Sequence, residues 1–96
     1  MDMKVGLVIP TYNRLDYLRR TLDSLQQSDL SKLNCLCVVD DCSREDVDAL
    51  LPSMKQLTSD FKFMKTPANA GVFIALTLGF NYLLSQKCNV LMNLMF

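Results

Sequence analysis

The sequence predicts an α/β layered domain in which helices flank a largely parallel sheet. Short apolar runs rich in branched residues alternate with segments of helical periodicity, and polar motifs follow the first two runs at once. Alternating strands and helices at this spacing are typical of parallel sheets. Ninety-six residues form at most one small domain. Ligands of such sheets bind beyond the carboxyl ends of the strands, which is where both polar motifs are expected.

The first strand is expected at residues 4–9, the run KVGLVI, because it is almost continuously apolar and is closed by Pro10. A helix should follow at once. Asn13 offers an N-cap, and Asp16 lies three residues later, as in a capping box. Leucines at positions 15, 18, 22 and 25 fall on one face of this helix.

The second strand, expected at residues 33–39, leads into two adjacent acids, Asp40 and Asp41. Neighbouring carboxylates repel each other and are costly to desolvate, so we expect them at the wet end of the strand, where a ligand or metal could use them. Ser43 is the expected N-cap of the next helix, which should kink or break at Pro52.

The last part of the sequence predicts a brief strand at residues 61–65, a loop at 66–71, a helix at 72–85 and a fourth strand at 89–96. The helix is so apolar that it should be covered on most sides. Its apolar stretch has about 15 residues where a membrane span needs about 20, and it contains Asn81, so a buried helix is the better interpretation. The apolar run near the N-terminus is too short for a signal peptide. We therefore expect a cytoplasmic chain without a transmembrane segment.

Composition argues against two classes of function. Ten basic and ten acidic residues balance, and only Arg19 and Arg20 are adjacent, so no basic stripe is available for nucleic acid. Four cysteines occur without a CxxC spacing and without any histidine, which argues against zinc. Cys35 and Cys37 should face the same side of a strand, as small buried thiols of a reducing compartment.

Two motifs lie at the predicted ligand edge, and each has a purely structural interpretation. PTYN, residues 10–13, supplies polar groups and a flat ring, but it could be only a capped strand-to-helix turn. DDCS, residues 40–43, could be only a helix N-terminus, where acidic residues are stabilised.

Taken together, VIPTYNR, CVVDDCSRED and NAGVFIALTLGFNYLL resemble, in this order and spacing, the N-terminal half of the family 2 glycosyltransferases with the GT-A fold. The resemblance extends from residue 5 to residue 94. It implies a partial, Rossmann-like nucleotide-diphospho-sugar transferase fold. Residues 1–96 would then be the incomplete N-terminal, nucleotide-binding part of such a domain.

The resemblance also implies a set of nucleotide-binding residues. Asp41 matches the acid that accepts a hydrogen bond from the base, typically uracil, which suits an ionised carboxylate. Asp40 matches the acid that more often supports the turn. The other matches line the nucleoside pocket by backbone, hydroxyl and ring, or belong to the N-x-G loop, where glycine allows close approach: Pro10, Thr11, Tyr12, Asn69 and Gly71.

The sequence departs from the family pattern in two places. The start of the third helix reads VFIALTL and carries no basic residue near the expected diphosphate. The D-x-D metal motif expected after the fourth strand is replaced by apolar residues 94–96. The resemblance implies a divalent metal, Mn or Mg, in a full-length parent, but this chain offers no metal ligand and no catalytic residue. We therefore expect a truncated or frame-altered piece that is inactive by itself.

Two functions from different classes remain open at this point. In the first, the full-length parent transfers a sugar from a nucleotide-diphosphate sugar, with a UDP-sugar as the favoured donor and an acceptor that the sequence does not name. In the second, the chain is a non-catalytic remnant or nucleotide-binding module. A flavodoxin-like phosphoacceptor domain is disfavoured, because its acidic pair should follow the first strand and not the second.

Overall fold

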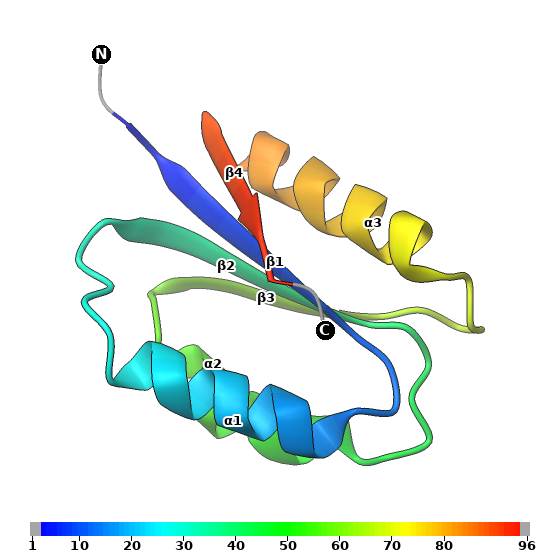
Figure 1. The fold of residues 1–96 in the computed structure, drawn as a ribbon. Helices are drawn as coiled ribbons and strands as arrows, with labels where there is room; N and C mark the ends of the chain where they lie inside the picture. Colours follow the sequence, from blue (N-terminus) through cyan, green and yellow to red (C-terminus); the bar gives the residue numbers. More distant parts are fainter. Residues whose placement is uncertain (1–2, 95–96) are drawn as a thin grey trace.

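The computed structural model describes residues 3–94, which form a four-stranded, all-parallel sheet flanked by helices (Figure 1). The strand order is β3-β2-β1-β4, and all neighbouring strands are parallel. The chain therefore crosses over between successive strands, and β4 pairs with the free edge of β1. The strands are β1 (Val5–Thr11), β2 (Leu33–Asp40), β3 (Asp60–Lys65) and β4 (Val90–Asn93). The layered, parallel α/β fold predicted from the sequence is confirmed.

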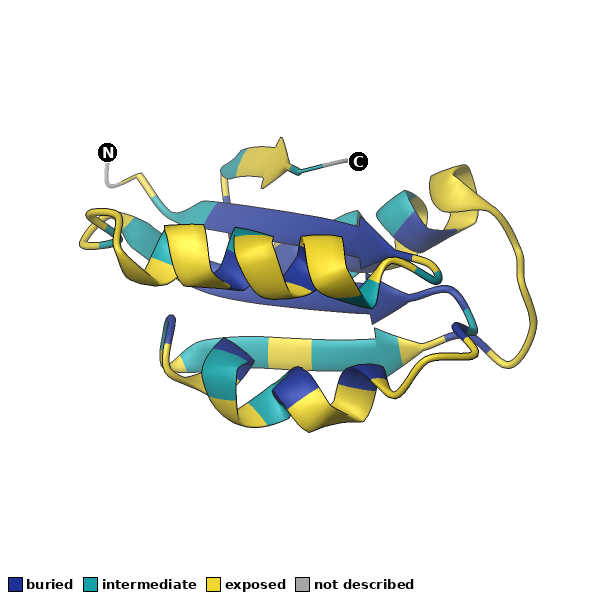
Figure 2. Ribbon diagram, turned by 60° about the horizontal axis from the view of Figure 1, so that its bottom comes forward, coloured by how far each residue is buried: buried dark blue, intermediate teal, exposed yellow. Residues whose placement is uncertain are grey.

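The helices cover opposite faces of this sheet (Figure 1). One face carries α1 (Leu15–Gln26), the short 3-10 helix η1 (Val47–Leu50) and α2 (Leu51–Lys55), and the other carries α3 (Val72–Ser85). Successive side chains of a strand point to opposite faces, so β1 and β2 supply both cores. This explains why their sequences are apolar without alternation, and Figure 2 shows both central strands buried while β4 is exposed.

The face under α3 contains small residues because this helix lies close to the sheet. A Cβ atom added to Gly79 would lie 2.1 Å from Cγ2 of Val8, so the helix or the valine would have to shift. Cys35 and Cys37 both pack on this face, as predicted, and burial raises the pKa of both thiols to about 12. Such thiols stay protonated and behave as small apolar side chains.

The outer face of α3 is exposed, so the prediction that this helix is covered on most sides is wrong. The buried positions Ala75, Gly79 and Leu83 form a single stripe four residues apart, which is all that contact with one sheet requires. On the other side, Phe73 is 79% exposed and Ile74 is 50% exposed. Within residues 3–94, no helix is both long and apolar enough to cross a membrane.

The predicted caps of the first two helices are also wrong, although α1 begins at Leu15 directly after the PTYN turn and Arg14. Asn13 does not cap α1: it has φ of 50°, and its Oδ1 accepts a hydrogen bond from the Arg44 N–H instead. Ser43 does not begin a helix either, because its N–H and hydroxyl bind Asp40. Helical structure begins only at Val47, with the 3-10 helix η1. The helix break predicted at Pro52 lies just before that proline, between η1 and α2, so Pro52 stands in the first turn of α2, where proline is tolerated.

Two strand ends differ from the prediction. β1 continues past Pro10 to Thr11. Proline has no backbone N–H to donate to a neighbouring strand, and this is tolerated here because β4 pairs with β1 only as far as Val8. The fourth strand, expected at residues 89–96, is observed at Val90–Asn93, and residues 95–96 lie outside the described part of the chain.

Candidate functional site

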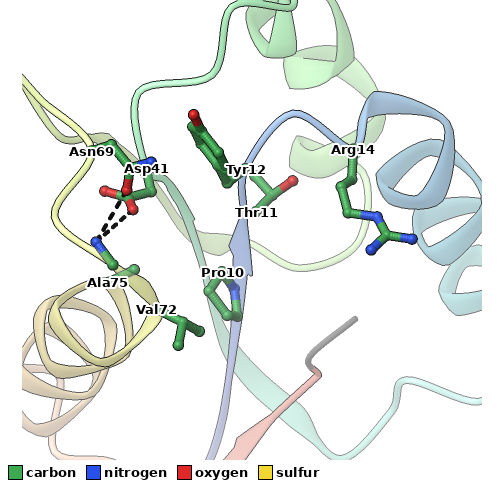
Figure 3. Close-up of a pocket in the computed structure, with 9 residues that line it drawn as sticks. Pro10, Thr11, Tyr12, Arg14, Asp41, Asn69, Val72 and Ala75 are labelled. Atoms are coloured by element: carbon green, nitrogen blue, oxygen red, sulfur yellow. Dashed lines mark hydrogen bonds between the residues drawn. The ribbon is translucent and has the colours of Figure 1, made fainter.

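A pocket of about 300 Å³ lies beyond the carboxyl ends of β1 and β2, next to the start of α3 (Figure 3). Six of the seven residues predicted as site residues line it: Pro10, Thr11, Tyr12, Asp41, Asn69 and Gly71. Three further lining residues, Arg14, Val72 and Ala75, were not predicted. Arg14 directly follows the PTYN motif, while the other two follow Gly71 at helical spacing, and that spacing is the signal that could have found them.

The two motifs meet because β1 and β2 end side by side. Thr11 is paired with Asp40 in the parallel register, and the Asp41 N–H donates to the Thr11 carbonyl oxygen at 2.9 Å. Beyond the strands, the Asn13 N–H donates to Ser43 Oγ at 2.8 Å, and the Arg44 N–H donates to Asn13 Oδ1 at 2.7 Å. The PTYN and DDCS turns therefore brace each other, a role of Asn13 that only the folded chain reveals.

Asp41 holds the loop that runs from the end of β3 to α3. Its Oδ1 accepts hydrogen bonds from the Thr66 hydroxyl at 2.8 Å and the Ala70 N–H at 2.9 Å, and its Oδ2 accepts one from the Gly71 N–H at 2.8 Å. Burial alone would raise the pKa of Asp41, but these three hydrogen bonds outweigh it and hold the pKa below the ordinary value of 3.8. A carboxylate offers about four acceptor positions, so about one remains for a further donor.

Asp40 is fully buried and does not line the pocket. Its Oδ1 accepts hydrogen bonds from the N–H and hydroxyl of Ser43, so it closes the turn after β2. Its Oδ2 has the Nζ of Lys65 at 3.9 Å and no hydrogen-bond donor among the described residues. Asp40 therefore supports the turn after β2.

The loop before α3 requires glycine at its last position. Gly71 has φ of 96°, in the left-handed region that other residues avoid, although a Cβ there would meet no atom within 4 Å. Its N–H also lies 3.2 Å from Asn69 Oδ1, so the asparagine side chain supports the same turn. The requirement for glycine therefore comes from backbone conformation and not from crowding.

Thr11 carries a polar group that the described chain leaves without a partner. The residue is 4% exposed, and its Oγ1 has no hydrogen bond within residues 3–94. Buried hydroxyls are normally paired, because desolvation without a partner costs free energy. Beside it, Tyr12 is 41% exposed and lines the same pocket, with its ring between Asp41 and Thr11 in Figure 3. An unpaired hydroxyl at a pocket wall is a feature that a bound ligand would satisfy.

The described residues do not fit a divalent metal ion. Within residues 3–94, no three Asp, Glu, Cys or His side chains are grouped closely enough to hold one. The two acids at the ends of the strands are committed to Ser43 and to the loop before α3. Residue 94, at the end of β4, is leucine. No chemical step is therefore assigned to a metal held by these residues.

A parallel sheet with an acid-lined pocket beyond its strand ends defines a ligand-binding α/β domain. The chain belongs to glycosyl transferase family 2, whose family model matches residues 7–93. The family resemblance seen in the sequence is thereby confirmed.

Among solved structures, the chain is similar to TarS 1-349 of S. aureus, crystallised in complex with UDP. The TM-score is 0.74 and the sequence identity is 20%, over 97% of this chain and 27% of the TarS chain. This likeness shows the shared fold, and the chain spans about a quarter of that structure's length. A comparison with curated proteins gave no match.

Proposed function

We propose that residues 1–96 form the nucleotide-binding part of a family 2 glycosyltransferase domain, with a UDP-sugar as donor. The observation that carries this proposal is Asp41, a buried carboxylate with a lowered pKa at the wall of the pocket. An ionised acid can only accept hydrogen bonds, so the ligand group that it meets must be a donor. The ring N–H of uracil is such a donor.

The rest of the pocket supports a nucleoside. A volume of about 300 Å³ is at the lower end of ligand sites, which suits a base and ribose better than a whole sugar nucleotide. Tyr12 offers an aromatic face, and Thr11 offers an unpaired hydroxyl. Asn69 and Gly71 line the same space. The UDP bound to TarS, a protein of the same fold, is consistent with this assignment.

The transfer reaction itself is proposed for a domain larger than these residues. In it, a nucleotide-diphosphate sugar would lose its sugar to an acceptor, and Mn or Mg would neutralise the leaving diphosphate. The residues described here would bind and orient the nucleoside. Within residues 3–94, no group of three Asp, Glu, Cys or His side chains is placed to hold that metal.

The proposal is tested by calorimetric titration of the 96-residue chain with uridine, UDP and cytidine. Cytosine presents an unprotonated ring nitrogen where uracil presents an N–H, so uridine should bind at least about tenfold more tightly, the effect of about 1.4 kcal/mol. Asp41→Asn should reduce this preference, whereas Asp23→Asn, an exposed acid on α1, should not. Equal affinity for uridine and cytidine in the wild-type chain would rule out the assigned role of Asp41.

A further inference from the structure

We propose that Arg14 binds the phosphate groups of the nucleotide, so that the pocket has an acceptor end at Asp41 and a cationic end at Arg14. This inference rests on the proposed function and adds to it a residue outside the predicted site. Arg14 carries the one positive charge among the nine lining residues, and Asp41 carries the one negative charge. In Figure 3 the two side chains lie on opposite sides of the pocket, with Thr11 and Tyr12 between them.

The guanidinium of Arg14 is available for an anion. The ion pairs formed among residues 3–94 are Arg19 with Asp16 and Lys65 with Asp40, and neither involves Arg14. Its guanidinium carbon lies 4.0 Å from the centre of the Tyr17 ring. Stacking of this kind uses the flat face of the guanidinium and leaves its in-plane N–H donors free, in the geometry that suits phosphate oxygens.

The backbone holds Arg14 at the edge of the pocket. Its carbonyl oxygen accepts the hydrogen bond of the Leu18 N–H at 2.9 Å, which fixes it at the start of α1. The preceding residue, Asn13, is fixed on both sides by its hydrogen bonds with Ser43 and Arg44. The side chain therefore starts from a rigid position, which reduces the entropy lost when it orders around an anion.

The charge distribution leaves few other candidates. A nucleotide diphosphate is an anion, and Asp41 has the same sign of charge, so binding needs a compensating cation. The first turn of α3 begins Val72-Phe73-Ile74 and offers none. Lys65 is paired with Asp40 and does not line the pocket.

The experiment compares the affinities of uridine, UMP and UDP for the 96-residue chain by calorimetry at low ionic strength. In the wild-type chain, UDP should bind more tightly than uridine by about three- to tenfold, as expected for a partly exposed charge-assisted contact. Arg14→Gln should abolish this increment and leave uridine affinity unchanged, and Arg14→Lys should restore part of it. Arg19→Gln is the matched control, because it removes the same charge from α1, five residues after Arg14 and outside the pocket.

The possible results separate the two proposals. If Arg14→Gln and Arg19→Gln reduce UDP binding equally, the effect is one of net charge and the role of Arg14 is overturned. The same conclusion follows if Arg14→Gln keeps the full difference between UDP and uridine. If the wild-type chain binds neither uridine nor UDP, the proposed function fails, and the inference fails with it. Loss of the phosphate increment in Arg14→Gln alone, with uridine binding retained, supports the inference.

Discussion

Replacing Thr11 by valine should stabilise the free chain and weaken its binding of uridine. Valine keeps the branched shape of threonine in β1 and removes the hydroxyl, which is buried and has no partner within residues 3–94. An unpaired buried polar group costs about 1–3 kcal/mol. At the lower end of this range, the gain is about 1 kcal/mol. A domain of this size should then melt about 4–8 °C higher.

The same substitution at Thr66 is the matched control. Thr66 is also buried, at 6% exposure, but its hydroxyl lies 2.8 Å from Asp41 Oδ1 and 2.9 Å from the Ala68 carbonyl oxygen. Thr66→Val removes a hydrogen bond to a charged group, and such bonds contribute about 1.5–3 kcal/mol, so it should lower the melting temperature by more than Thr11→Val raises it. The two variants should therefore shift stability in opposite directions.

Thermal melts followed by circular dichroism measure the first effect, and calorimetric titration with uridine measures the second. Thr11→Val should bind uridine about five- to tenfold more weakly, because the ligand loses a hydrogen bond of about 1 kcal/mol. A destabilised Thr11→Val chain would show that the hydroxyl already has a partner, such as an ordered water. A stabilised chain with unchanged uridine affinity would show that the hydroxyl does not face the ligand.

Three further results are expected. The lowered pKa of Asp41 contributes stability that is fully present above the ordinary pKa of 3.8 and is lost as the pH falls through the folded-state value. The difference in melting temperature between wild type and Asp41→Asn should therefore shrink below about pH 4. A constant difference down to pH 2.5 would contradict this. Gly79→Ala should destabilise the chain by about 1–3 kcal/mol or more in urea unfolding, because the new Cβ would lie 2.1 Å from Val8 Cγ2. A Gly79→Ala chain that unfolds at the same urea concentration as wild type would show that α3 is not so close to β1. The chain should self-associate through the uncovered face of α3, and Phe73→Asp should shift it toward monomer in sedimentation; a monomeric wild type would exclude this.

The sequence by itself determined the order of the elements and the position of the site. Central parallel strands are buried on both faces, so the unbroken apolar runs of β1 and β2 could be recognised without knowing their partners. The bounds of α3 were predicted correctly as residues 72–85, because a long apolar segment after Gly71 has few alternatives. The two motifs could be placed at one edge, because the carboxyl ends of parallel strands meet there.

Only the tertiary structure decided what each polar side chain does. Asn13 and Ser43 are residue types that often cap helices, yet each forms a hydrogen bond with the neighbouring turn. This happens because β1 and β2 end side by side and bring the two turns within hydrogen-bond distance. Asp41 holds a loop about 30 residues away in the chain, and no local pattern specifies such a partner. The exposure of α3 likewise depends on which surfaces surround the helix. Apolar periodicity shows that a helix has a face to bury, but contacts between distant segments decide which face is buried and which polar group is left for a ligand.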